Sequence, residues 1–224
     1  MIPQCIGIIL DGNRSWARKK DLSVFEGHKA GFEKLKEVFL WVKDAGIKTL
    51  IVYAFSTENW NRKPEEVSGL LNLFRNALQN EMNSFKEAGA RIRCVGDIQK
   101  FSKDLQNMIA RVEEETKHNT GVTLAVCLSY GGRAEILNAT EKLLKEIKET
   151  VAEAEFEKHL WTAGIPDPDM IIRPGGEKRL SGFLTWQSVY SELFFSDTLW
   201  PDFSKNEFET LLKEFKERER RRGK

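Results

Sequence analysis

Five short apolar segments alternate with longer helix-like segments along this chain, and this alternation restricts the possible folds more than any other feature of the sequence. The segments are rich in Ile, Val and Leu, as strands covered by helices on both faces are. They lie at residues 5–10, 49–55, 90–95, 122–128 and 170–173. Such an alternation predicts an α/β fold with a mainly parallel central sheet flanked by helices. We expect a single domain over residues 1–224, because no linker or internal repeat divides the chain.

The segments between the predicted strands carry residues that are typical of helix starts and ends. Gly46 and Gly89 end two of the patterns, and Pro64 suits the first turn of the second. The predicted helices cover residues 29–45, 64–88, 102–118, 134–149 and 205–221, with an additional outer helix over residues 150–161.

Charge and cysteine content argue against several classes of protein. The net charge of +1 gives no general attraction to nucleic acid or to an anionic membrane. The three cysteines lack metal-ligand spacing, which argues against a disulfide framework and a zinc site and favours a reducing compartment. No apolar run approaches the roughly 20 residues of a membrane span, and no signal-peptide pattern is visible. We expect a cytoplasmic protein, with peripheral residence at the membrane left open.

Polar residues gather where the predicted strands end. The five strands lead into "DGNRSW", "AFSTENWNR", "GD", "SYGGR" and "RPGGEKRLSGF". In parallel α/β sheets, ligands bind beyond the carboxyl ends of the strands. The rim predicted in this way gathers Asp11, Asn13, Arg14, Ser56, Asn59, Arg62, Arg133, Arg173 and Arg179.

The composition of this rim suits phosphate, since arginine offers a planar fork of charged donors and glycine lets backbone N–H groups approach closely. "RPGGEKRLS" would place Arg173, Arg179 and Ser181 around one anion, although surface acids are alternative partners for these arginines. "DGNRSW" would form a second anion site, or else an ordinary Asp-Gly turn. Neither stretch has the spacing of a Walker loop or of a dinucleotide fingerprint.

Two further residues have both a functional and a structural interpretation. Asp11 is the acid of the first cluster, where it would hold Mg²⁺ beside a diphosphate or else cap a turn. His28, in "EGHKAG", would donate a hydrogen bond or shuttle a proton, although a lone histidine is more often structural.

An apolar stripe follows Pro64 at helical spacing, and it predicts either core packing or the wall of a cavity for a long hydrocarbon. Its members are Val67, Leu70, Leu71, Phe74, Leu78, Met82 and Phe85. Strand alternation would put Leu124, Val126 and Leu128 on one face, where they would form another wall of such a cavity. Leu124 is farthest from the polar rim and is the predicted floor.

Seven motifs in order resemble those of the cis-prenyltransferases, most closely the bacterial undecaprenyl diphosphate synthases. They are "DGNRSWA", "GHKAG", "YAFSTENWNRKPEEV", "YGGR", "IIRPGGEKRLSGFLTWQ", "SELFF" and "LWPDF". The resemblance extends from Ile6 to the terminal "RERRRG".

The resemblance implies a homodimeric, Mg²⁺-dependent enzyme with a hydrophobic product tunnel. Such an enzyme adds isopentenyl diphosphate repeatedly, with cis geometry, to farnesyl diphosphate. Its product would be undecaprenyl diphosphate, precursor of the lipid carrier for cell-wall polysaccharides such as peptidoglycan, and it would partition into the membrane. Alternatives are a family member with another product length and a non-catalytic partner subunit. Subunits of the latter kind lose the acid and the substrate loop, whereas Asp11, Asn59, Arg173 and Arg179 are present here.

The resemblance also implies roles for individual residues. Asp11 would bind the metal, with help from Glu192, and Asn59 would accept a proton. The allylic diphosphate would be surrounded by Gly12, Asn13, Arg14, Ser15, Trp16 and His28. A mobile loop over the reacting carbons would contain Ser56, Thr57, Glu58, Asn59, Trp60 and Arg62. Isopentenyl diphosphate would be held by Arg173, Arg179, Leu180 and Ser181.

Two positions depart from the family pattern. Ser15 stands where an arginine is usual, and Val24 stands where a basic residue is common. The allylic diphosphate site therefore lacks two expected cations. Arg14, Arg18 and Lys19 are candidates to compensate, and weaker substrate binding is the alternative.

Overall fold

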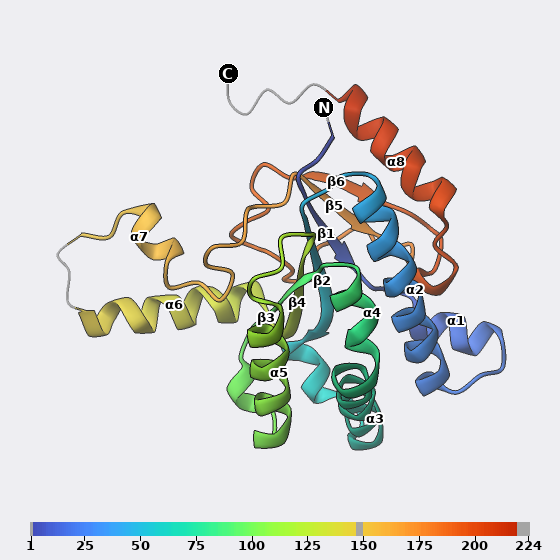
Figure 1. The fold of residues 1–224 in the computed structure, drawn as a ribbon, viewed down its shortest axis with the longest axis horizontal. Coiled ribbons are helices and arrows are strands. Elements are labelled where there is room, and N and C mark those ends of the chain that lie inside the picture. The colour runs from blue at the N-terminus through green and yellow to red at the C-terminus, as the bar shows by residue number, and fades with distance from the viewer. Residues whose placement is uncertain (1, 147–149, 219–224) are drawn as a thin grey trace.

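All six strands of the central sheet run parallel in the computed structural model, which describes residues 2–146 and 150–218 (Figure 1). The strands are β1 (Cys5–Ile9), β2 (Thr49–Ser56), β3 (Arg91–Val95), β4 (Thr123–Tyr130), β5 (Met170–Arg173) and β6 (Glu192–Phe195). Their order in the sheet is β3-β4-β2-β1-β5-β6. The parallel α/β fold expected from the sequence is confirmed. β6 was not predicted, because it is a short edge strand in which only Phe194 is buried.

The predicted helices are found in order with shifted ends, and α1 was not predicted. The helices are α1 (Asn13–Lys19), α2 (Val24–Asp44), α3 (Pro64–Asn76), α4 (Met82–Glu87), α5 (Lys103–Thr116), α6 (Gly132–Glu146), α7 (Glu153–Glu157) and α8 (Lys205–Glu217). Short 3-10 turns cover η1 (Thr57–Asn61), η3 (Ile98–Lys100) and η4 (Trp200–Asp202). The ends of the predicted helices 134–149 and 205–221 lie partly outside the described residues.

Three helix predictions were wrong in part. α2 begins at Val24 rather than at residue 29, because Ser23 and Glu26 form a capping box. The predicted helix 64–88 is interrupted by a π-helical turn, η2 (Ala77–Glu81). The predicted helix 150–161 shortens to α7, because a buried bond from Thr162 N to Glu135 Oε1, 2.9 Å long, holds the following chain in turns.

Apolar side chains cover both faces of the sheet. On one face α2, α4 and α8 pack against β1, β2 and β4, with Val38, Leu50 and Phe208 in a large cluster. On the opposite face Ile51 and Cys127 pack with Phe183 and Leu184 of the segment after β5. Figure 1 shows α6 and α7 extending from one side of this body.

A buried carboxylate anchors α6 to this second face. Glu135 Oε1 accepts hydrogen bonds from Thr162 N and Oγ1, and Oε2 accepts from Tyr130 Oη at 2.5 Å and from Gln187 Nε2 at 3.1 Å. Four donors therefore satisfy a carboxylate that is fully buried.

Two irregularities near the carboxyl ends of β2 and β4 alter which side chains face each side of the sheet. Tyr53 pairs with Cys127, Phe55 with Leu128 and Ser56 with Tyr130. Ala54 is therefore an extra residue in β2, and Ser129, whose φ is 49°, is an extra residue in β4. As a result, Phe55 and Leu128 pack together against α3 and α5.

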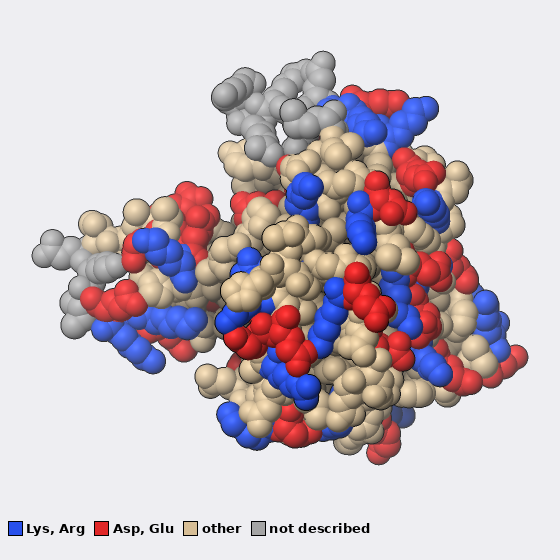
Figure 2. All heavy atoms as spheres, in the orientation of Figure 1, with Lys and Arg blue, Asp and Glu red and all other residues tan. Residues whose placement is uncertain are grey.

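The surface carries no simple charge pattern on the face drawn in Figure 2, where acidic and basic side chains are intermixed. Among the described residues, none of the helices is long and apolar enough to span a membrane.

Candidate active site

A deep apolar cavity begins at the carboxyl edge of the sheet and runs along it beneath α2, α3 and α4. Its volume is about 230 Å³. The wall formed by the helices includes Phe32, Leu35, Leu70, Leu73, Phe74, Ala77, Leu78, Met82 and Phe85. The wall formed by the strands includes Leu124, Val126 and Leu128, as the alternation of β4 predicted. Leu124 is the second residue of β4 and lies toward the end farther from the polar mouth.

The mouth of the cavity gathers seven of the predicted site residues. They are Asp11, Asn13, His28, Ser56, Asn59, Arg62 and Arg173. A neighbouring pocket is lined by Ser56, Thr57, Glu58 and Ser181 together with Arg133. The other predicted residues, Gly12, Arg14, Ser15, Trp16, Trp60, Arg179, Leu180 and Glu192, line neither pocket.

Asp11 follows β1 in a tight turn that leads into α1. Gly12 has φ 105°, and a Cβ there would lie 2.9 Å from Leu199 Cδ2, so both its conformation and its surroundings favour glycine. Asp11 Oδ1 accepts a hydrogen bond from Gly12 N at 2.8 Å. The side chain is 37% exposed at the cavity mouth. Asp11 is thus held in place with one face open.

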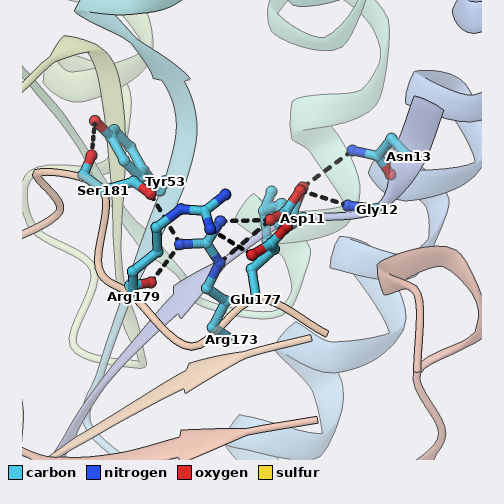
Figure 3. A network of polar contacts seen from close by, with 9 residues as sticks. Asp11, Gly12, Asn13, Tyr53, Arg173, Glu177, Arg179 and Ser181 are labelled. Atoms are coloured by element: carbon cyan, nitrogen blue, oxygen red, sulfur yellow. Dashed lines mark hydrogen bonds and ion pairs between the residues drawn. The ribbon is translucent and has the colours of Figure 1, made fainter. Parts of the chain in front are cut away.

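Arg173 at the end of β5 is bonded to both sides of the site (Figure 3). Its Nε and Nη2 donate to Asp11 Oδ2 at 3.2 and 2.6 Å, and Nη1 donates to Ser181 Oγ at 2.9 Å and to the carbonyl of Arg179. Arg173 and Ser181 therefore meet as the sequence predicted. The Arg179 guanidinium instead pairs with Glu177 and is largely exposed. Leu180 packs at the edge of the core under this loop.

The segment after β2 folds into the turn η1. Asn59 Oδ1 accepts from Ser56 N at 3.2 Å, and Trp60 Nε1 donates to Ser129 Oγ at 2.9 Å. The Trp60 ring also packs edge-on against Phe55, with 5.0 Å between centroids. These contacts hold Asn59 at the cavity mouth.

α1 packs closely against the start of α2, and this contact accounts for "EGHKAG". A Cβ at Gly27 would lie 2.3 Å from the Asn13 carbonyl oxygen, and one at Gly31 would lie 2.2 Å from Asn13 Oδ1. Trp16, on the outer part of α1, donates from Nε1 to Asp202 Oδ1 at 2.7 Å. The close packing brings Asn13 and His28 to the same mouth.

Three basic groups surround the carboxylate of Glu66. Its Oε1 lies 2.9 Å from Arg62 Nη1, 3.6 Å from Arg14 Nε and 3.7 Å from His28 Nε2. Burial, reinforced by the Arg62 guanidinium, lowers the pKa of His28 from 6.5 to about 4. The imidazole is therefore neutral at pH 7. Glu66 was not predicted from the sequence, although its i,i+4 spacing from Arg62 is a visible signal.

Two buried polar atoms at the mouth lack a hydrogen-bond partner, namely Asn13 Oδ1 and His28 Nε2. Both residues line the cavity. Because buried polar atoms are ordinarily satisfied, the unpartnered His28 Nε2 is suited to meet a bound ligand or water, whereas Asn13 Oδ1 faces Gly31 of α2.

Within one chain Glu192 does not lie beside Asp11, and its role at a metal stays a prediction. Glu192 pairs with Met170, the first residue of β5, whereas Asp11 follows the other end of β1. The Glu192 Oε2 atom lies 2.9 Å from Arg218 Nη1. Strand register therefore places the two carboxylates toward opposite ends of the sheet.

Asp11 alone still fits the donor chemistry of Mg²⁺. Its Oδ1 accepts one hydrogen bond, which leaves a lone pair available on an oxygen at the open mouth. Mg²⁺ commonly takes one or two carboxylates and completes its shell with water and phosphate oxygens.

Comparison with known proteins gives consistent matches over the whole chain. Residues 9–223 match the family described as "Putative undecaprenyl diphosphate synthase". The chain is 43% identical over 222 residues to an isoprenyl transferase of Fusobacterium nucleatum, with 99% of this chain and 96% of the relative covered. It is 44% identical over 234 residues to an isoprenyl transferase of Thermus thermophilus, with 99% and 89% covered.

Two solved structures share the fold. One is lavandulyl diphosphate synthase from Lavandula x intermedia in complex with dimethylallyl diphosphate, with a TM-score of 0.94, 31% identity and coverage of 100% of this chain and 99% of that one. The other is a probable undecaprenyl diphosphate synthase from Campylobacter jejuni, with a TM-score of 0.84, 32% identity and 99% of both chains covered.

Proposed function

We propose that the chain extends farnesyl diphosphate with isopentenyl diphosphate, in cis geometry, to undecaprenyl diphosphate. It belongs to the undecaprenyl diphosphate synthase family and is a prenyltransferase. The observation that carries this proposal is the juxtaposition of an apolar cavity with a mouth that contains Asp11, His28, Arg62 and Arg173. A prenyl diphosphate has the same division into a hydrocarbon tail and an anionic head.

The cavity supplies binding energy for the growing tail. Burial of a hydrocarbon contributes about 0.8 kcal/mol for each CH₂ group. The proposed product tunnel runs from the mouth, past Phe74 and Leu78, toward Leu124. In this arrangement, the end of the cavity limits product length.

The mouth would bind two diphosphates in adjacent sites. Asn13, Arg14 and His28 would hold the allylic diphosphate, and the buried, unpartnered His28 Nε2 supports this placement. Arg173, Arg179 and Ser181 would hold isopentenyl diphosphate. Arg173 reaches Ser181 through a bond of 2.9 Å, whereas the exposed Arg179 must leave Glu177 to join them.

The condensation breaks the allylic C–O bond, and the diphosphate leaves with the electron pair. The isopentenyl double bond supplies electrons for the new C–C bond, and loss of a proton restores a double bond. Mg²⁺ held by Asp11 would neutralise charge on the departing diphosphate. Asn59 is the proposed proton acceptor, and its Oδ1 keeps a lone pair beyond the bond from Ser56 N. Holding both reactants at one mouth supplies the contribution of proximity.

We also propose a homodimer. Large apolar side chains are exposed next to and on the edge strand β6, where Val189 is 73%, Tyr190 64% and Leu193 36% exposed. A second copy would cover them, and sedimentation velocity would measure the assembly. Product partitioning into a membrane and a cytoplasmic, peripheral location remain predictions.

The function is tested by incubating the protein with farnesyl diphosphate, radiolabelled isopentenyl diphosphate and Mg²⁺, with and without EDTA. We expect EDTA-sensitive incorporation into a main lipid of undecaprenyl length. A main product of another length would favour the alternative family member. No incorporation under any condition would overturn the proposal.

A further inference from the structure

Glu66 occupies the centre of the basic cluster at the cavity mouth. Its Oε1 meets Arg62 Nη1 at 2.9 Å, Arg14 Nε at 3.6 Å and His28 Nε2 at 3.7 Å. The three partners come from α1, α2 and the residue that follows η1, while Glu66 itself lies in the first turn of α3. One carboxylate oxygen therefore links four segments.

This carboxylate offsets a concentration of positive charge. Arg14 and Arg62 both approach Oε1, and the Glu66 side chain is only 13% exposed. Two guanidinium groups so placed would repel each other without an anion between them. Glu66 is therefore the counter-ion that allows Arg14 and Arg62 to converge here.

Glu66 does not accept hydrogen bonds from all three of these groups. Only the Arg62 contact has the length of a hydrogen bond, since 3.6 and 3.7 Å exceed the usual range. His28 Nε2 is buried without a hydrogen-bond partner. A phosphate carries more acceptor oxygens and more negative charge than a carboxylate, so it suits these three groups better.

A bound diphosphate and Glu66 would compete for the same groups. Arg14 and His28 belong to the proposed allylic diphosphate site, and both approach the single oxygen Oε1. They cannot surround a diphosphate and keep this arrangement, and the like charges of diphosphate and carboxylate repel each other.

We infer that Glu66 is a resident counter-ion, which holds Arg14 and Arg62 together beside the neutral His28 in the free protein and is displaced from them by the allylic diphosphate. The inference rests on the proposed function and adds a positioning residue to that site. Because Glu66 follows η1 closely in sequence, its displacement would transmit diphosphate binding to the segment that carries Asn59.

The test compares Glu66→Gln with Glu65→Gln by titrating inorganic pyrophosphate into each protein in a calorimeter. Both changes remove one negative charge from the same helical turn, but Glu65 is exposed and outside the cluster. We expect Glu66→Gln to bind pyrophosphate at least about five-fold more tightly than the wild type, and Glu65→Gln to stay within about two-fold. The KM for farnesyl diphosphate should fall in Glu66→Gln, while the KM for isopentenyl diphosphate should not.

A double variant assigns the effect to the correct site, because pyrophosphate can also enter the Arg173 site. In the Arg14→Ala background, Glu66→Gln should no longer tighten pyrophosphate binding. Melting curves identify a variant that fails to fold, and Glu66→Ala then replaces Glu66→Gln in the same comparison.

Several results would overturn the inference while leaving the proposed function intact. One is an active wild type that binds pyrophosphate as tightly as Glu66→Gln or more tightly. The others are an equal gain in pyrophosphate affinity in Glu65→Gln, and a gain in affinity from Glu66→Gln that persists in the Arg14→Ala background. A wild type that neither binds pyrophosphate nor condenses the substrates would contradict the proposed function itself, and the inference would fall with it.

Discussion

Asp11 Oδ2 lies 2.6 Å from Arg173 Nη2, and this ion pair joins the carboxyl ends of the neighbouring strands β1 and β5. Arg173 is 4% exposed, whereas Asp11 faces the cavity mouth. The same acid therefore neutralises a buried cation and keeps one face open at the cavity mouth. We expect stability and activity to be coupled at this position.

The first prediction separates these two roles. Asp11→Ala should abolish most turnover and also destabilise the fold by about 1–3 kcal/mol, because it removes an acceptor from the buried Arg173 guanidinium. Asp11→Asn should lose turnover as well but retain more stability, since its amide oxygen still accepts a bond from Arg173. Urea unfolding and labelled-lipid assays measure the two effects. Near-normal turnover of either variant in Mg²⁺ would rule out the metal role.

The second prediction distinguishes the two diphosphate sites. Arg179→Ala should raise the KM for isopentenyl diphosphate by one to two decades, the equivalent of a charge-assisted contact of about 1.5–3 kcal/mol. Its melting temperature should hardly change, because the side chain is largely exposed. Arg14→Ala is the matched variant and should act chiefly on farnesyl diphosphate. If Arg179→Ala weakened only the allylic substrate, the assignment of the two sites would be reversed.

The third prediction concerns product length. Leu124 lines the cavity and is 1% exposed, so Leu124→Ala should deepen the cavity and lengthen the main lipid product. It should also cost roughly 2–5 kcal/mol of stability. Leu105→Ala is the control, because Leu105 is equally buried but does not line the cavity. Mass spectrometry of the lipids should show a longer main product for Leu124→Ala alone. An unchanged product length would show that Leu124 has a purely structural role.

The fourth prediction concerns pH. Folding lowers the pKa of His28 from 6.5 to about 4, so below pH 6.5 the unfolded chain binds a proton that the folded protein does not. His28 therefore destabilises the fold increasingly as the pH falls from 6.5 to 4, by about 3 kcal/mol in total. Urea unfolding at pH 7 and pH 4 should show a smaller loss of stability for His28→Gln than for the wild type. Equal losses in the two proteins would show that His28 is not buried in its neutral form.

The sequence predicted those parts of the fold that local patterns determine. The five predicted strands have continuous apolar runs, and Leu124, Val126 and Leu128 reach the cavity because strand alternation places them on one face. The gathering of Asp11, Arg62 and Arg173 followed from their positions beyond strand ends, and that of His28 from the family resemblance.

The remaining features depend on contacts between distant segments. The position of Glu192 is set by the register of β6 on β5, which its own motif does not reveal. The segment after α7 is tied to α6 through Thr162 and Glu135, which lie 27 residues apart in the sequence. Glu66 meets His28 and Arg62 beside the mouth only because α1, α2 and α3 converge.

The two extra residues in β2 and β4 compensate for each other. Ala54 adds a residue to one strand, and Ser129 adds a residue to the other shortly afterwards, so the strands return to step by Ser56 and Tyr130. Loss of either residue alone would leave the following segment out of step, with Phe55 or Tyr130 turned to the wrong face. Loss of both would restore the register but remove both irregularities. The two extra residues therefore act as a pair, since only together do they place Phe55 beside Leu128 and return the strands to register.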